Sequence, residues 1–130
     1  MDSEMIFKQI LDCAFEVHKT LGPGLLESTY EECLCYELER EGLQAQRQVM
    51  LPVNYKGIKL DAGYRIDILV EEEIILELKS VTKLNELHMA QMITYLKLSN
   101  NHLGLLINFN SKLLKDGIKR VINTNEQYIE

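Results

Sequence analysis

The chain has 130 residues, of which 46% are hydrophobic and 26% are charged, and its formal net charge is −6 at pH 7. This length suits a single domain spanning residues 1–130, and the composition is that of a soluble globular protein rather than a disordered or membrane-spanning one. Phosphate binding depends on Lys and Arg, so the acidic balance disfavours tight non-specific binding of nucleic acid, while a local basic surface or a metal-bridged contact stays compatible with it.

Neither targeting signals nor disulfides are predicted. No apolar run approaches the ~20 residues that a membrane-spanning helix needs, and the acidic N-terminal stretch MDSEMIFKQ is unlike a signal peptide. Three cysteines, an odd number, argue against a disulfide framework. Cys33 and Cys35 lie two positions apart on a predicted helix, which is poor geometry for one metal ion. We therefore expect a cytoplasmic protein with no membrane partner.

The N-terminal third predicts two helices. Apolar residues recur at helical spacing over 3–20, where Ser3 is the expected N-cap. The segment GPG at 22–24 ends this helix, because proline cannot continue it and glycine allows a sharp turn. A second helix is expected from about Leu26 to Glu41, with Gly42 at its C-terminus. The two helices should form a hairpin or an angled pair.

The pattern then changes to that of strands. Residues 46–55 and 59–70 are expected to be two strands joined by a turn around Gly57. The acidic turn EEE at 71–73 leads into a buried strand over 74–81. Three further elements are predicted: a helix over 85–100 capped by Asn85, a buried strand over 102–110 and an edge strand over 117–123. The order α-α-β-β-β-α-β predicts an α/β or α+β fold, with a central mixed sheet of four to five strands flanked by helices.

The buried strand IILELKSV at 74–81 contains two charged residues, Glu77 and Lys79. Charged side chains are almost never fully buried unless they are paired or bind a metal. Because side chains alternate along a strand, a three-residue turn centred on Glu72 places Asp67 opposite Glu77. The same register pairs two apolar sets, Ile66 with Leu78 and Ile68 with Leu76, and puts Ile66, Ile68 and Val70 on one face.

Two readings of these charged residues remain open. Carboxylates directly opposite each other are destabilising, and a hard divalent cation such as Mg²⁺ would remove that penalty. Lys79 would then orient a water molecule and offset charge on a phosphoryl group. Alternatively, the residues form a polar ladder at the surface, in which Glu77 pairs with Arg65 or Lys79.

Three motifs resemble a known group of proteins. Asp67 followed by Glu77-Leu78-Lys79 resembles the D…(D/E)xK signature of the PD-(D/E)XK nuclease superfamily, although Ile66 stands where the signature has proline. GLLESTY at 24–30 is similar to the G-x-x-E-x-x-Y motif of the GxxExxY proteins, a family of small bacterial and archaeal proteins placed in this superfamily. QMITY at 91–95 is similar to a Q-x-x-x-Y helix that follows the catalytic strand in several branches. The resemblance covers about residues 17–121.

The resemblance implies a restriction-endonuclease-like αβββαβ core and a nuclease that uses Mg²⁺ or Mn²⁺. It implies DNA, in preference to RNA, as the partner, with a protein partner or a homodimer as further expectations. The site residues that it implies are the metal ligands Asp67, Glu77 and Glu27, the water-positioning Lys79, and Gln91 and Tyr95 beside Lys79.

Several of these residues, and others near them in the sequence, also have a purely structural interpretation. Glu27 could be a first-turn acid favoured by the helix dipole, and Gln91 an ordinary polar helix residue. Gly22 and Gly24 are expected to be turn residues. The remaining structural readings are core packing with a hydroxyl partner for Tyr30 and Tyr95, and either a contact near Glu27 or a helix C-terminal position for His18.

Two other functions compete with the nuclease. The first is a non-catalytic interaction module on the same fold, acting within a nucleic-acid-processing complex, which the acidic charge favours. The second is a small-molecule or metal-binding protein, for which the sequence offers no Gly-rich phosphate loop or His/Cys metal motif. The basic stretch at 112–120 is expected to be a solvated face.

Overall fold

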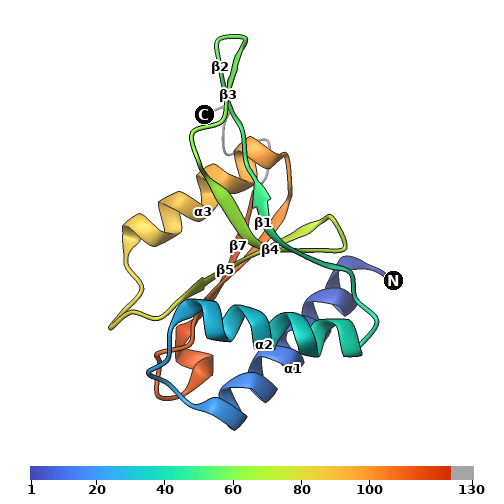
Figure 1. Cartoon of the computed structure of the whole chain (residues 1–130), viewed down its shortest axis with the longest axis vertical. Coiled ribbons are helices and arrows are strands. Elements are labelled where there is room, and N and C mark those ends of the chain that lie inside the picture. The colour runs from blue at the N-terminus through green and yellow to red at the C-terminus, as the bar shows by residue number, and fades with distance from the viewer. Residues whose placement is uncertain (124–130) are drawn as a thin grey trace.

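The structure, a computed structural model, describes residues 1–123. Figure 1 shows α-helices packed around a twisted sheet, with a narrow hairpin projecting from the body. The elements are α1 (Ser3–Leu21), α2 (Glu27–Arg40), β1 (Ala45–Met50), β2 (Val53–Tyr55), β3 (Ile58–Leu60), β4 (Arg65–Val70), β5 (Ile74–Lys79), α3 (Glu86–Ser99), β6 (Leu103–Asn108), the 3₁₀ helix η1 (Leu114–Gly117) and β7 (Ile118–Ile122). Within these described residues, no helix has both the length and the apolar character to cross a membrane.

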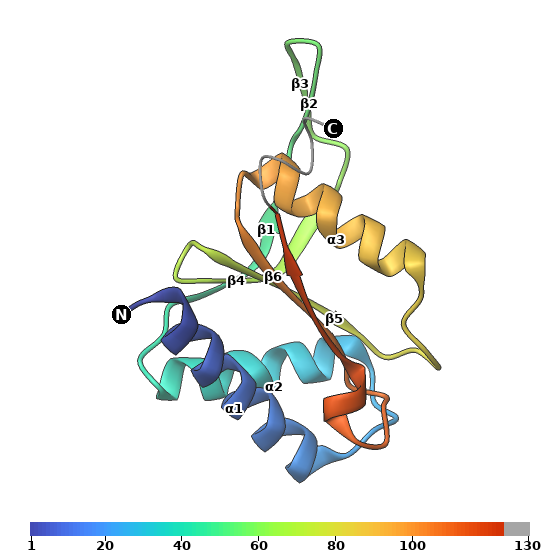
Figure 2. The same ribbon diagram turned by 180° about the vertical axis from the view of Figure 1, so that it is seen from behind.

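Five of the strands form one mixed sheet in the order β1-β4-β5-β6-β7. All neighbours are antiparallel except β5 and β6, which are parallel and are joined through α3. Helices α1 and α2 cover one face of this sheet and α3 covers the other, as the two opposite views show (Figures 1 and 2). The predicted α+β fold with a mixed five-stranded sheet is confirmed, and β7 is the predicted edge strand.

The segment between β1 and β4 differs from the prediction. The two long strands expected over 46–55 and 59–70 are each divided, and their inner halves form a separate hairpin of β2 and β3. Lys56 and Gly57 turn this hairpin with φ of 48° and 84°. Its residues are largely exposed, so no buried face holds them in the main sheet. A strand pattern alone does not show this, because strand propensity is similar in both arrangements.

Two hydrophobic layers enclose the sheet, one on each face. On β5, Ile74, Leu76 and Leu78 pack in the layer beneath α1 and α2. Ile75 packs in the layer beneath α3. Because side chains alternate along a strand, the charged residues that follow Ile75 at every second position also belong to the α3 face.

The residues at the helix ends agree with most of the predicted caps. Asn85 caps α3 as expected, and His88 completes a capping box with it. Gly42, with φ of 82°, follows the C-terminus of α2 as predicted. The predicted N-cap of α1 is wrong by one residue: the side chain of Asp2 accepts the capping hydrogen bond, and Ser3 is the first helical residue.

Gly104 on β6 allows α3 to lie close to the sheet. A Cβ atom at this position would lie 2.6 Å from Sδ of the buried Met92. We expect Gly104→Ala to lower the free energy of unfolding by about 1–3 kcal/mol, the usual range for overpacking. Urea denaturation measures this loss. In the double variant with Met92→Val the loss should be smaller than the sum of the single losses, and strict additivity would contradict the contact.

Candidate functional site

The strands β4 and β5 separate where their two carboxylates meet. Backbone pairing runs in the predicted register as far as Ile68 and Leu76 and stops there. Beyond this point the N–H of Leu78 donates to Oδ2 of Asp67 at 2.8 Å, and the N–H of Asp67 donates to Oε2 of Glu77 at 2.9 Å. The two carboxylates therefore lie between the strands and accept the hydrogen bonds that backbone carbonyls would otherwise accept.

This separation corrects part of the predicted hairpin. The pairing expected between Ile66 and Leu78 does not form. Ile66 packs in the layer beneath α3 together with Ile75, whereas Ile68 packs beneath α1 and α2. The prediction that Ile66 shares a face with Ile68 is therefore wrong. On the neighbouring strand β1, Gln48 has a left-handed φ of 49°, so the backbone is distorted beside the carboxylates on that side as well.

Burial and mutual repulsion govern the charge of the carboxylate pair. Glu77 is only 5% exposed. Burial first, and then the negative charge of Asp67, raise the pKa of Glu77 from its ordinary value to about 8. Burial also raises the pKa of Asp67. The pair thus resists carrying two negative charges near neutral pH, and either a proton or a cation relieves it.

Lys79, Gln91 and Tyr95 lie together beside the carboxylates. Nζ of Lys79 donates to Oε1 of Gln91 at 3.4 Å, which links the end of β5 to α3. Tyr95, one turn along the same helix, is buried; burial raises its pKa, and the negative charge of Glu77 adds to that rise. The structure thus brings five predicted site residues to one place: Asp67, Glu77, Lys79, Gln91 and Tyr95.

The alternative of a surface ladder fails for one of its pairs. Arg65 donates to Oδ1 of Asp61 at 3.3 Å and to the carbonyl oxygen of Tyr64 at 2.9 Å, and forms no ion pair with Glu77. Glu77 is also buried rather than at the surface. A ladder between Glu77 and Arg65 is therefore wrong.

Glu27 is placed next to this group but is engaged elsewhere. It is exposed in the first turn of α2, and its Oε2 accepts a hydrogen bond from the N–H of Ser80 at 3.1 Å. Oγ of Ser80 in turn donates to the carbonyl oxygen of Leu25 at 2.7 Å. These bonds tie the start of α2 to the residue that directly follows Lys79.

Comparison with known proteins gives the family. A sequence model of the PD-(D/E)XK nuclease superfamily matches residues 4–121, most of the chain. The chain belongs to the PD-(D/E)XK nuclease superfamily. Neither a curated protein nor a solved structure matches the chain significantly. The mixed sheet with its flanking helices is consistent with the restriction-endonuclease-like fold that was expected.

A divalent metal, typical of PD-(D/E)XK nucleases, fits the chemistry of the carboxylate pair. Asp67 and Glu77 offer hard oxygen ligands in a buried site whose charge is unbalanced. Within residues 1–123 no group of three or more His, Cys, Asp or Glu side chains could hold a metal. Mg²⁺-type ions often use only one or two carboxylates, with water and substrate phosphate supplying the rest. The donor set therefore suits an ion that substrate helps to bind.

Sequence reasoning missed Glu31, a buried carboxylate on α2. Its Oε2 accepts from Nε and Nη2 of Arg47 at 3.1 and 2.9 Å, and its Oε1 accepts from Nε2 of Gln48 at 2.6 Å. The same Nε2 lies 3.4 Å from Oδ1 of Asp67. Glu31 thus connects α2 to the carboxylate pair. It is in the buried stripe with Leu34 and Leu38, so helical periodicity was the available signal.

Gly22, which precedes the GLLESTY segment, and Gly24 and Tyr30 within it have structural roles. Gly22 and Gly24 adopt φ of 72° and 100°, which confirms them as turn residues. The fully buried Tyr30 donates to the carbonyl oxygen of Gly22 at 2.6 Å and accepts from the N–H of Leu25 at 3.1 Å. Its ring stacks on that of Phe109, with 4.5 Å between centroids. Core packing with a hydroxyl partner is confirmed for Tyr30.

His18 lies at the end of α1 and contacts the loop after β6 rather than Glu27. Its Nε2 lies 2.8 Å from the carbonyl oxygen of Ser111, in the loop after β6. It stands in the last turn of α1, where a histidine suits the helix dipole. Of the two interpretations of His18, a helix C-terminal position is therefore the one that the structure shows.

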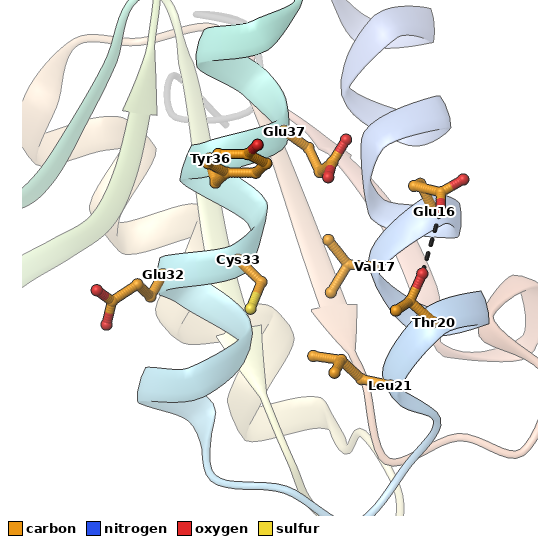
Figure 3. Close-up of a pocket in the computed structure, with 8 residues that line it drawn as sticks. All are labelled: Glu16, Val17, Thr20, Leu21, Glu32, Cys33, Tyr36 and Glu37. Atoms are coloured by element: carbon orange, nitrogen blue, oxygen red, sulfur yellow. Dashed lines mark hydrogen bonds between the residues drawn. The ribbon is translucent and has the colours of Figure 1, made fainter.

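A separate groove lies between α1 and α2. Figure 3 shows Val17, Leu21 and Cys33 along its floor and Glu16, Glu32 and Glu37 around it. Its volume is about 340 Å³. The residues that line it include acidic and apolar side chains but no basic one, so it lacks the cation that a phosphate site needs. The groove is therefore not suited to bind a phosphate group.

Proposed function

We propose that the protein is a metal-dependent nuclease of the GxxExxY family, which hydrolyses phosphodiester bonds of DNA in preference to RNA. Mg²⁺ or Mn²⁺ would be held by Asp67 and Glu77. The observation that carries the proposal is the pair of carboxylates between β4 and β5, with Lys79 one pleat further along the same strand face. The superfamily match supports the same chemistry.

The chain's own residues supply specific parts of the reaction. When bound, the divalent ion acts as a Lewis acid that polarises the phosphate and makes water more acidic. Lys79, whose amine is held by Gln91, orients the attacking water and offsets the charge that develops on the phosphoryl oxygens. Water attacks phosphorus and releases a proton to solvent, the bond to the 3′-oxygen breaks, and that oxygen takes up a proton from solvent. The products carry a 5′-phosphate and a 3′-hydroxyl.

Glu27, expected as a third ligand, enters this proposal as a positioning residue. Its Oε2 accepts from Ser80, so it fixes the backbone directly after Lys79. Tyr95 packs beside Glu77 and excludes water from the buried carboxylate. Metal binding therefore depends on Asp67 and Glu77, and the position of Lys79 depends on Glu27 and Gln91.

The test combines metal binding with cleavage. We expect Asp67→Asn to weaken Mn²⁺ binding, measured by calorimetry, by at least roughly 10-fold and to abolish cleavage of labelled DNA. Glu27→Gln keeps an acceptor for the Ser80 N–H and should bind Mn²⁺ nearly as the unmodified protein does. An equal loss of binding in both variants would make Glu27 a ligand.

Contaminating nucleases are controlled by the variants themselves. All proteins are purified identically and incubated with single- and double-stranded DNA and RNA, in Mg²⁺, Mn²⁺ or EDTA. Cleavage that persists in EDTA, or that is equal in Asp67→Asn, would contradict the proposed function. Cleavage that needs metal and Asp67 supports it.

One observation favours a second candidate, a non-catalytic interaction module. The groove between α1 and α2 is apolar at its floor, and Glu16 and Glu37 lie at its rim (Figure 3). Such a surface fits a basic partner protein, which would bring positive charge to an acidic chain. Cleavage by the isolated chain, lost in Asp67→Asn, would exclude a purely non-catalytic role.

The remaining expectations concern assembly and location. A homodimer stays a prediction, which light scattering of the purified chain measures. A cytoplasmic location likewise stays a prediction. The three cysteines are free. Burial raises the pKa of the Cys13 and Cys35 thiols to about 11, so neither is a reactive thiolate near neutral pH.

A further inference from the structure

A cavity of about 690 Å³ opens beside Lys79, and neither Asp67 nor Glu77 is among the residues that line it. Lys79 and Gln91 contribute its polar end. Val53, Tyr64 and Tyr95 are among the residues that line the rest. The cavity therefore joins the proposed site of phosphate chemistry to a wall of aromatic and apolar side chains.

The aromatic wall presents a ring that is free to stack. Tyr64 is 45% exposed, although tyrosine is a large and partly apolar side chain. Its ring meets that of Tyr95 edge-on, with 6.1 Å between centroids and 67° between planes. An edge-on neighbour fixes the tyrosine ring and leaves a face available. Nucleobases stack on such rings whatever their sequence.

The β2–β3 hairpin, which carries two lysines, is connected at its base to this cavity. Val53 begins the hairpin and Tyr64 lies just after it, so both of its connections reach the cavity. Lys56 and Lys59 lie on the hairpin, which projects from the body away from α1 and α2 (Figures 1 and 2). In a chain of net charge −6, these lysines are placed to contact the phosphates of a strand that leaves the cavity.

We propose that this cavity takes one unpaired nucleobase, stacked on Tyr64, and that the substrate is therefore single-stranded DNA. The inference rests on the proposed function, since the nucleotide's phosphate lies at Lys79. A base inside the cavity cannot remain paired or stacked in a duplex. A fully paired duplex offers such a base only after a base pair has been opened, which costs free energy, so the duplex binds more weakly.

The test measures binding in EDTA, where no cleavage occurs. A fluorescein-labelled ten-nucleotide single-stranded DNA is titrated with the protein, and its anisotropy is compared with that of the matched duplex and of the same sequence as RNA. We expect Tyr64→Ala to weaken single-strand binding by roughly 10- to 100-fold, the effect of losing one stacked base. Tyr64→Phe keeps the ring and should bind as the unmodified protein does.

Two further variants make the result specific to the cavity. Ala90 is exposed and lines the cavity, so Ala90→Trp should fill it and weaken single-strand binding as Tyr64→Ala does. Tyr36 is an exposed tyrosine on α2, in the other groove, and Tyr36→Ala should leave binding unchanged. Equal binding of duplex and single strand, or no effect of Tyr64→Ala and Ala90→Trp, would overturn the inference.

The failure of this inference is distinct from failure of the proposed function. Cleavage of duplex and single strand at equal rates, insensitive to Tyr64, would keep the nuclease and reject the cavity as a base site. Tyr64-dependent binding of single strands without metal-dependent cleavage would keep the base site and reject the nuclease. RNA that binds as tightly as DNA would support stacking but overturn the choice of DNA.

Discussion

Lys79→Ala should reduce kcat for metal-dependent cleavage by roughly 10²–10³ or more, the effect of removing one preorganised group that stabilises developing charge. Lys79 lies two residues after the buried Glu77, and its amine is held by Gln91. The hydrogen bond of this amine goes to the amide of Gln91 rather than to a carboxylate, so its removal breaks no hydrogen-bonded ion pair. The variant should therefore fold normally and still bind Mn²⁺ at the carboxylates.

Two variants separate this effect from a general loss of positive charge. Lys83→Ala removes an exposed lysine four residues away and should retain full activity. Lys79→Arg keeps the charge but replaces a compact ammonium with a planar fork, so only partial activity is expected. Single-turnover cleavage at saturating Mn²⁺ measures all three. Activity of Lys79→Ala within about two-fold of the unmodified chain would remove Lys79 from the mechanism.

Much of the site could be predicted because burial fixes strand register. The apolar residues of β4 and β5 must pair with apolar partners, and a shift of the register by one residue would set carboxylates against them. This constraint alone placed Asp67 next to Glu77. The hydrogen bonds around these two residues could not be predicted, because the carboxylates replace backbone carbonyls as acceptors. That exchange depends on the distance between strands, which has no trace in the residue pattern.

The parts that escaped prediction share a different cause, which is contact between segments distant in sequence. Glu31 binds Arg47 and Gln48 on another element, and Glu27 binds Ser80. An acid in the first turn of a helix has a sufficient local explanation, so the sequence does not show that it also has a distant partner. The sequence of the β2–β3 hairpin likewise indicates strands, but it does not show that these strands lie outside the main sheet.

Glu77→Gln should make the metal-free protein more stable at pH 8, by roughly 2–4 kcal/mol, and should abolish tight metal binding. The amide keeps an oxygen that accepts the hydrogen bond from the N–H of Asp67, and it carries no charge to bury. The site would thus be less stable with its native carboxylate than with a neutral isostere. A loss of stability of this kind is expected where a side chain serves function rather than folding.

The pH dependence identifies the cause of this gain. The pKa of Glu77 is about 8 in the folded chain and near 4.5 when unfolded. Between these values the folded chain holds a proton that the unfolded chain has released, so the unfolding free energy falls as pH rises, by up to roughly 1.4 kcal/mol per unit. Glu77→Gln removes this fall, and its advantage should shrink below about 1 kcal/mol at pH 5.

Urea denaturation at pH 5 and pH 8, with and without Mn²⁺, measures the effect. Added Mn²⁺ should stabilise the unmodified chain at pH 8, because it binds the ionised carboxylates of the folded state, and should not stabilise Glu77→Gln. Glu72→Gln removes the same charge from the exposed β4–β5 turn and serves as the matched control. A parallel fall in stability from pH 5 to pH 8 in both the unmodified chain and Glu77→Gln would show that the buried charge of Glu77 is not its source.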